Sequence, residues 1–249
     1  MKLSFVIPAH NEEANIAKCL SSIMEQLNAT RRDAEIIVVA NACTDGTKRV
    51  ALSFKGVTVV DEPHKGLVKA RRAGFLASHG DLIANIDADT MLTPGWLEKV
   101  VQEFDEQKDL VALSGPFIYY DLNIIQRACI RIFYYLGYIF YLLNRFVLRN
   151  GSMLQGGNFV VRRSGLERIG GYDTEKFDFY GEDTDLARRL NAVGPVKFTF
   201  TLPMYTSGRR VLHEGIWVTG FHYAMNYFWT IFFKRPFTKS STDVRPQKE

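Results

Sequence analysis

Residues 35–46 read EIIVVANACTDG and combine a strand pattern with a turn. The consecutive apolar residues Ile36–Ala40 are typical of a strand buried on both faces, as the central strands of parallel sheets are. The Thr44-Asp45-Gly46 triplet that follows predicts a turn and the start of a helix. We therefore predict a strand over Glu35–Asn41 within a parallel sheet.

The same alternation of strand and helix patterns extends to both sides of this stretch. Apolar runs predict further strands at Leu3–Pro8, Val57–Val60 and Asp81–Ile86. Helix patterns begin at the capping residue Asn11, at about Leu67 and at Pro94. Strands that alternate with helices imply right-handed crossovers. The sequence therefore predicts an α/β fold with a mostly parallel, twisted sheet flanked by helices.

Two aromatic stretches in the second half, residues 122–149 and Gly215–Phe233, predict amphipathic helices. In each, polar residues recur every three or four positions, which puts them on one helix face opposite a broad apolar face. These positions are Arg127, Arg131, Tyr134, Tyr138, Tyr141, Arg145 and Arg149 in the first helix, and Thr219, His222, Asn226, Thr230 and Lys234 in the second. Such helices lie either at a membrane surface or against the protein itself.

Charge and composition favour a membrane surface over nucleic acid. The net charge is +4, which is too small to indicate nucleic-acid binding by itself. Basic and aromatic side chains together on the two helices are typical of contact with anionic lipid. The three cysteines show no paired spacing, and the N-terminus has no long apolar segment. We therefore expect a reducing compartment, no signal peptide, and a cytoplasmic protein that lies peripherally on the inner face of the membrane.

Candidate functional residues lie where three of the predicted strands end. Pro8-Ala9-His10 follows the first strand, Asn41 ends the second, and Asp87-Ala88-Asp89 follows Ile86. Parallel sheets bind ligands at the carboxyl ends of their strands. The carboxylates of Asp87 and Asp89 repel each other, and Mg²⁺ or Mn²⁺ that also bridges phosphate oxygens would supply the charge they need. The sequence therefore predicts a metal and phosphate site at this edge.

A second acidic pair, Glu182 and Asp183, precedes the helical pattern TDLARRLNAVG. The helix dipole keeps carboxylates at this position ionised, so Asp183 is a candidate general base. Arg209 and Arg210 follow a turn later in the chain, and guanidinium groups bind phosphate in a forked geometry. We expect these arginines to hold a diphosphate or a phosphate on an acceptor. The alternatives are helix capping for the carboxylates and a solvated basic turn for the arginines.

Six blocks of the sequence, in order from Leu3 to about Arg210, resemble the family 2 glycosyltransferases. The blocks are VIPAHNEE, VVANACTDGT, KGLVKARRAG, IDADT, GGNFVVRRSGLERIGGYD and YGEDTDLARRL. The resemblance implies a GT-A fold and an inverting enzyme that takes a sugar from a nucleoside diphosphate with Mg²⁺ or Mn²⁺ as cofactor. It also implies a division into a glycosyltransferase domain at 1–210, with nucleotide-binding (1–90) and acceptor-binding (91–210) parts, and a C-terminal amphipathic helix and tail at 211–249.

For the donor, the resemblance implies a pocket built at the strand ends. The residues that match the family's donor site are Pro8, Ala9, His10, Glu12, Asn41, Arg71, Asp87, Ala88 and Asp89. Asp89 is implied as the main protein ligand of the metal, with Asp87 between metal and ribose. Asn41 stands where the family usually has an aspartate that faces the base, and asparagine can donate as well as accept hydrogen bonds. Uridine is favoured as the base, and guanosine stays open.

For the acceptor, the resemblance assigns Glu182 and Asp183 to the acceptor side, with Asp183 as the catalytic base. The processive signature Gln-x-x-Arg-Trp is absent, which favours transfer of a single hexosyl or N-acetylhexosaminyl group. With the two helices, this predicts a membrane-associated acceptor, either lipid-linked or glycan. Two alternatives stay open, a sugar-nucleotidyltransferase and a non-catalytic membrane-bound protein that binds nucleotide sugars.

Overall fold

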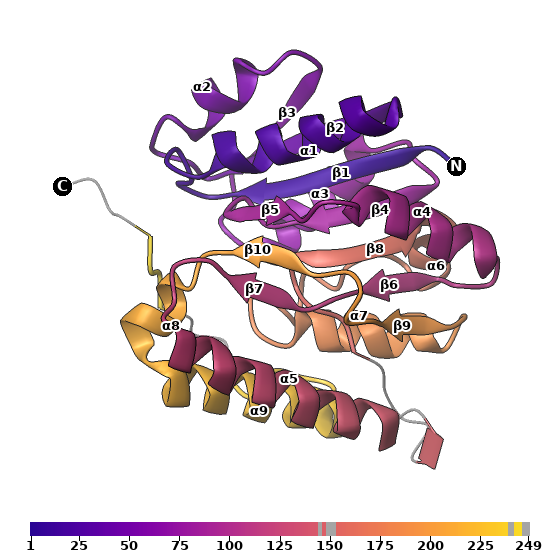
Figure 1. The fold of residues 1–249 in the computed structure, drawn as a ribbon, viewed down its shortest axis with the longest axis vertical. Helices are drawn as coiled ribbons and strands as arrows, with labels where there is room; N and C mark the ends of the chain where they lie inside the picture. Colours follow the sequence, from indigo (N-terminus) through magenta and orange to yellow (C-terminus); the bar gives the residue numbers. More distant parts are fainter. Residues whose placement is uncertain (144–145, 148–152, 239–241, 246–249) are drawn as a thin grey trace.

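The computed structural model describes residues 1–143, 146–147, 153–238 and 242–245. Its main sheet has seven strands in the order β3-β2-β1-β4-β8-β6-β9 (Figure 1). They are β1 (Leu3–Ala9), β2 (Ala34–Asn41), β3 (Val57–Glu62), β4 (Leu82–Ile86), β6 (Ala112–Ser114), β8 (Asn158–Arg162) and β9 (Val196–Phe198). A second sheet, in the order β5-β10-β7, consists of β5 (Thr90–Leu92), β7 (Phe117–Tyr119) and β10 (Met204–Thr206).

The helices pack against the sheets or form a separate layer. They are α1 (Ile16–Thr30), α2 (Thr47–Leu52), α3 (Leu67–Ala77), α4 (Trp96–Glu106), α5 (Ile124–Leu143), α6 (Arg163–Arg168), α7 (Glu182–Asn191), α8 (Arg209–Glu214) and α9 (Ile216–Phe233). Figure 1 shows α5 and α9 running together as a layer away from the strands β1–β4. The rings of Phe140 on α5 and Phe228 on α9 lie 4.9 Å apart, so the two helices are in direct contact.

The pairing of the strands confirms a mostly parallel sheet. β1 pairs in parallel with β2 and β4, and β2 pairs in parallel with β3. β2 is buried from Ile36 to Asn41, as its continuous apolar run requires. The exception is β8, which lies antiparallel between β4 and β6. The observed α/β architecture agrees with the fold that the sequence predicts.

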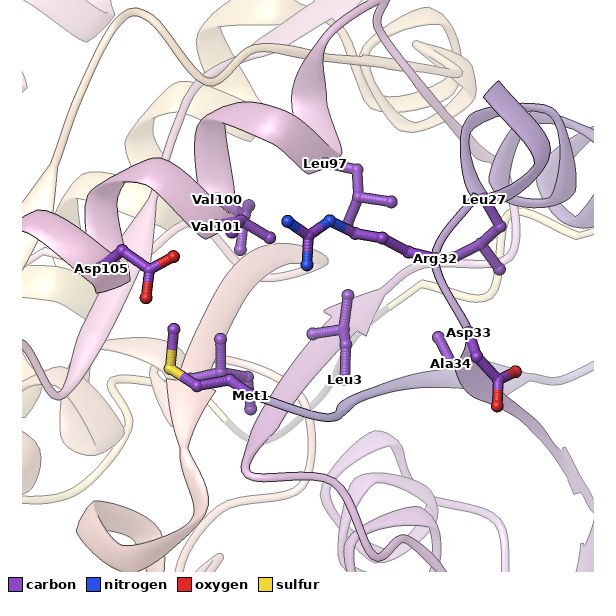
Figure 2. Close-up of a pocket in the computed structure, with 11 residues that line it drawn as sticks. Met1, Leu3, Leu27, Arg32, Asp33, Ala34, Leu97, Val100, Val101 and Asp105 are labelled. Carbon is purple, nitrogen blue, oxygen red and sulfur yellow. The ribbon is translucent and has the colours of Figure 1, made fainter. Parts of the chain in front are cut away.

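A small pocket opens at the end of the sheet where β1 and β2 begin (Figure 2). Leu3, Arg32 and Ala34 are among the residues that line it. Leu3 and Ala34 are the first residues of β1 and β2, so this pocket lies at the amino ends of the strands. The residues with candidate chemistry follow the carboxyl ends, and this pocket is therefore separate from them.

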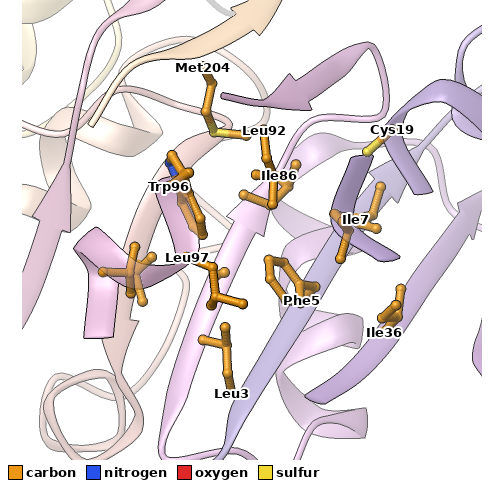
Figure 3. Packing of buried hydrophobic residues seen from close by; sticks show 14 of the residues in the cluster. Leu3, Phe5, Ile7, Cys19, Ile36, Ile86, Leu92, Trp96, Leu97 and Met204 are labelled. Atoms are coloured by element: carbon orange, nitrogen blue, oxygen red, sulfur yellow. The ribbon is translucent and has the colours of Figure 1, made fainter. Parts of the chain in front are cut away.

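Alternate side chains of β1 pack into two hydrophobic cores, one on each face of the main sheet. Successive side chains of a strand point to opposite faces. Phe5 and Ile7 pack into a core shared with α1 and α4, where Trp96 is buried (Figure 3). Val6, between them, packs into a second core with Val68 of α3 and residues of α7. The sheet is covered on both faces, which fixes the positions of its strand ends.

Part of the polar stripe of each helix, α5 and α9, faces the domain. The Tyr134 hydroxyl donates to Gln155 Oε1 at 2.9 Å, and the Tyr141 hydroxyl donates to the Val196 carbonyl at 3.2 Å. In α9, the stripe residues Thr219, Asn226 and Thr230 are buried. The large apolar residues of both helices are exposed, including Ile125, Ile132, Leu136, Ile139, Trp217, Phe221, Phe232 and Phe233. The helices therefore pack against the protein through these residues. Arg127 and Arg131 of the α5 stripe and Lys234 after α9 are exposed, and the outward surface is otherwise aromatic and aliphatic.

The predicted first amphipathic helix, at 122–149, is longer than the described α5. Arg145 and Arg149 of its predicted polar stripe lie outside the described residues. Within the ranges that are described, none of the helices combines the length and apolar content needed to cross a membrane. Part of the predicted tail, residues 242–245, is described and contacts the domain.

Asn158 ties β8 to α4 and to the loops that precede β7 and β10, and we expect its removal to destabilise the fold. Its buried Nδ2 donates to the carbonyls of Gly115, Pro116 and Leu202, and its Oδ1 accepts the Trp96 indole N–H. Asn158→Ala leaves these buried groups unpaired and should lower the free energy of unfolding by about 3 kcal/mol or more, measured by urea denaturation. Asn28→Ala, at an exposed position of α1, should change it little. Equal effects from the two variants would contradict this role of Asn158.

Candidate active site

Three strands of the main sheet bring the predicted donor residues to one edge. His10 follows β1, Asn41 ends β2 and Asp87 follows β4. These strands pair directly and run parallel, so their carboxyl ends are neighbours. Glu182 begins α7 and binds Arg71 of α3, which in turn binds Asp87. Arg209 begins α8 and contacts Asp89. Residues far apart in the sequence therefore meet there.

The buried side chain of Arg71 links the two acidic pairs. Its Nη1 donates to Glu182 Oε1, and its Nη2 donates to Asp87 Oδ1 at 3.3 Å. The guanidinium lies over the ring of Phe159, with 5.3 Å between Cζ and the ring centroid. Burial lowers the pKa of Arg71, but Glu182 and Asp87 outweigh this effect and raise the pKa, so the guanidinium stays charged.

Asp183 lies beside this group at the first turn of α7. Its Oδ2 accepts a hydrogen bond from the Gly156 N–H at 3.2 Å, and its Oδ1 accepts one from the Thr184 N–H at 2.7 Å. Burial raises the pKa of Asp183 in spite of these hydrogen bonds. Burial also raises the pKa of Glu182 to about 7, against the opposing effect of Arg71. Both carboxylates are therefore stronger bases than carboxylates in water.

Gly157 allows the backbone to approach Asp87 closely. It has a φ of +77°, and a Cβ atom there would lie 2.1 Å from Asp87 Oδ2. The Gly157 carbonyl accepts the N–H of Asp87 at 3.4 Å. A side chain at this position would displace the Asp87 carboxylate, so only glycine fits.

A second charged group surrounds Asp89. Arg209 Nη2 lies 3.0 Å from Asp89 Oδ2, and the same guanidinium binds both carboxylate oxygens of Glu12. Glu12 Oε1 also accepts a hydrogen bond from Arg245 Nε at 3.0 Å. Burial raises the pKa of Asp89 to about 7, with Glu12 and Asp87 adding to the rise and Arg209 opposing it. The residues predicted for metal and diphosphate are thus in contact with each other.

The chemistry of these residues fits a divalent cation. Burial is the main cause of the raised pKa of Asp89, and the nearby carboxylates of Glu12 and Asp87 add to it, so a cation would meet negative charge beside Asp89. In the described part of the chain, no three His, Cys, Asp or Glu side chains are grouped closely enough to hold a metal by themselves. Asp89 and Asp87 would therefore supply the protein ligands, and phosphate oxygens the others, which is the usual way in which Mg²⁺ is bound with substrate phosphates.

The predicted base-facing residue, Asn41, has its amide bound to the backbone. Its Nδ2 donates to the carbonyls of Glu62 and His64, and its Oδ1 accepts the Gly66 N–H at 2.9 Å. The Asn41 carbonyl lies 2.7 Å from His10 Nδ1. In this structure Asn41 shapes the loop at 62–66, and its contact with a base stays a prediction. Pro8 and Ala9 are the last residues of β1, and Ala88 is buried beside Asp87.

Arg209 and Arg210 are neighbours in sequence but face different partners. Arg210 Nη1 pairs with Glu214 at 2.8 Å, and its guanidinium lies 4.7 Å from the ring centroid of Phe179. Arg209 alone contacts the Asp89 group. Arg245 could not be identified from the sequence, because its position in a polar tail resembles that of any solvated basic residue.

The family model described as "Glycosyl transferase family 2" matches residues 4–170, more than half of the chain. The chain belongs to glycosyl transferase family 2. It is 28% identical over 208 residues to the probable glycosyltransferase YdaM of Bacillus subtilis (strain 168), an alignment that covers 78% of this chain and 47% of that protein. The chain spans less than half the length of the first curated relatives that it matches.

Solved structures match the fold over nearly the whole chain. The mannosyltransferase PcManGT from Pyrobaculum calidifontis, in complex with GDP-Man and Mn²⁺, has a TM-score of 0.67 at 18% identity, covering 93% of this chain and 63% of that one. Glucosyl-3-phosphoglycerate synthase from Mycobacterium tuberculosis, in complex with Mn²⁺, UDP and phosphoglyceric acid, has a TM-score of 0.62 at 21% identity, covering 94% and 78%. The chain therefore has a GT-A glycosyltransferase fold.

We expect Asp89 to be required for binding of a divalent cation. Asp89→Ala should remove the increase in Mn²⁺ binding that UDP or GDP brings, measured by electron paramagnetic resonance of Mn²⁺, because the ion loses a principal carboxylate ligand. Asp109→Ala, at an exposed position, is the matched control and should bind like the unchanged chain. Nucleotide-dependent Mn²⁺ binding by Asp89→Ala at the unchanged level would contradict the metal assignment.

Proposed function

We propose that this protein is an inverting, metal-dependent glycosyltransferase. It moves one hexosyl or N-acetylhexosaminyl group from a nucleoside diphosphate to a membrane-associated acceptor, lipid-linked or glycan. UDP-sugars are favoured as donors, with GDP-sugars as the alternative. The observation that carries the proposal is the meeting of two acidic pairs at one sheet edge, where Arg71 binds Asp87 and Glu182.

The donor half consists of the strand-end residues and the Asp89 group. Asp87 and Asp89 would hold Mg²⁺ or Mn²⁺, and the bound ion offsets negative charge on the leaving diphosphate. Arg209 carries its guanidinium next to Asp89, where it would also bind phosphate oxygens. Structural neighbours solved in complex with Mn²⁺ and GDP-Man or UDP support a divalent cation together with a nucleotide donor.

The acceptor half consists of Asp183 and Glu182. Asp183 would take the proton from the acceptor hydroxyl as its oxygen attacks the anomeric carbon, while the bond from that carbon to the diphosphate breaks. Buried Glu182 Oε2 has no hydrogen-bond partner among the described residues. Since such an atom needs a donor, we assign it to a hydroxyl of the acceptor or of the donor sugar. Arg71 fixes Glu182 in this position.

The alternatives have less support. A sugar-nucleotidyltransferase would not account for the family match, nor for a buried carboxylate at Asp183 whose pKa is raised. A non-catalytic nucleotide-sugar-binding protein needs neither the orphaned oxygen of Glu182 nor the buried Arg71 that positions it.

A membrane-associated acceptor is supported by the outward face of α5 and α9. Trp217 is 74% exposed and Ile125 72% exposed, so large apolar side chains lie where a soluble helix would carry polar ones. Arg131 lies on the same helix layer, and Lys234 and Arg235 follow α9 directly. Exposed aromatic residues beside basic ones favour the headgroup region of an anionic membrane.

The general base is tested by Asp183→Asn, which keeps the shape of the side chain. We expect the turnover number to fall by about 10²–10⁴-fold, with little change in the affinity for UDP or GDP with Mn²⁺. Asp33→Asn, at the opposite end of the sheet, should leave both unchanged. Because burial raises the pKa of Asp183, kcat/KM of the unchanged enzyme should rise with pH through an apparent pKa above the ordinary ~3.9 of aspartate. Nearly full turnover in Asp183→Asn would assign the base elsewhere.

The membrane surface is tested by sedimentation with vesicles. The protein should pellet with anionic vesicles more than with neutral ones, and high salt should release only part of it, because salt screens charge but leaves apolar burial intact. The double variant Trp217→Ser/Phe221→Ser should remove the salt-resistant part, and charge reversal at Arg131, Lys234 and Arg235 the salt-sensitive part. Leu76→Ser, at an exposed apolar position of α3, is the control. Full solubility of the unchanged protein beside anionic vesicles would contradict the membrane assignment.

A further inference from the structure

The C-terminal residues 242–245 lie against the predicted donor pocket. Arg245 Nε donates to Glu12 Oε1 at 3.0 Å, although more than two hundred residues separate them in the sequence. Glu12 is 3% exposed, so the guanidinium of Arg245 reaches a buried carboxylate rather than a surface one. Figure 1 shows residues 242–245, drawn in yellow, on the side of the sheet where β1 ends.

Asp243 fixes this segment at a second point of the same pocket. Its Oδ2 lies 2.7 Å from Lys65 Nζ and 3.7 Å from His10 Nε2. Its Oδ1 accepts the backbone N–H of Arg245 at 3.2 Å. Partial burial would raise the pKa of Asp243, but the hydrogen bonds from Lys65 and Arg245 lower it to about 2, so the carboxylate is ionised at neutral pH. The segment is therefore held by ion pairs at two points, Glu12 after β1 and Lys65 after β3.

Two guanidiniums converge on Glu12. Arg209 binds both of its carboxylate oxygens, and Arg245 binds one of them. Two cations this close repel each other, and Glu12 together with Asp89 offsets their charge. A divalent ion that enters beside Asp89 adds positive charge next to both arginines. The diphosphate of a sugar nucleotide is a dianion, and it would restore the balance.

We propose that Arg245 is a donor-binding residue that contacts the diphosphate together with Arg209, an inference that rests on the diphosphate donor of the proposed function. The Nε of Arg245 is held by Glu12 and Nη1 lies 3.4 Å from Asp243 Oδ1, which orients the planar guanidinium. A guanidinium held in this way presents its remaining N–H groups to phosphate oxygens without further ordering. Binding of the donor thereby fastens the C-terminal segment over the pocket.

The affinity for inorganic pyrophosphate in the presence of Mn²⁺, measured by calorimetry, tests this role. Pyrophosphate lacks both base and sugar, so it reports on the phosphate contacts alone. We expect Arg245→Gln to weaken its binding by roughly tenfold to a hundredfold, the range of a lost charge-assisted hydrogen bond. Arg32→Gln, at the amino ends of the strands, is the matched control and should bind like the unchanged chain. Equal affinities in Arg245→Gln and the unchanged chain would overturn the inference.

Hydrogen exchange at the Arg245 amide supplies a second readout. The proposal expects slower exchange when Mn²⁺ and pyrophosphate are bound, because the segment then gains a contact. Faster exchange, or tighter pyrophosphate binding by a chain that ends at Thr242, would show that the segment competes with the donor and would overturn the inference. Pyrophosphate binding that depends on Arg245 in a protein without transferase activity would instead support this inference and contradict only the proposed function.

Discussion

The buried guanidinium of Arg71 is the constraint on which the rest of the site depends. A fully buried positive charge is stable only with partners, and removing one partner of such a pair costs about 3–5 kcal/mol. Its partners, Asp87 and Glu182, come from the end of β4 and the start of α7. The fold therefore cannot bury Arg71 without bringing the carboxylates of Asp87 and Glu182 together. Phe159 of β8 packs against the Arg71 guanidinium, and Gly157, just before β8, lies against the Asp87 carboxylate.

Much of the donor half of the molecule follows from local sequence. The apolar run at Ile36–Ala40 is rich in β-branched residues and is followed by a turn, so it predicts a buried parallel strand, and strand ends predict where ligands bind. The position of Asp87 and Asn41 at one edge could thus be predicted. The antiparallel insertion of β8 and the second sheet could not, because strands of three residues such as β5 show no readable period and their pairing is decided by contacts distant in sequence.

Side-chain partnerships were harder to predict than positions. Helical periodicity identifies a polar stripe on α5 and α9, but it does not say which face meets the protein. Tyr134 and Tyr141 turn inward because the backbone of the domain offers them hydrogen-bond partners. Asn41 likewise stands at a strand end as predicted, yet its amide binds the backbone of a loop. The partner of Arg245 could not be predicted from the sequence, since only the folded chain brings this C-terminal arginine to Glu12.

The outward aromatic face of α5 and α9 also governs how the isolated protein behaves in aqueous buffer. Apolar patches of this kind associate with one another when nothing else covers them. Trp217 and Phe221 of one molecule are then available to the same residues of another. Sedimentation velocity in the absence of lipid should therefore report mass that grows with protein concentration, and a mild detergent should return it to that of a single chain. The same exposed face of α5 and α9 that is proposed to contact a membrane would thus also determine how far the purified protein self-associates.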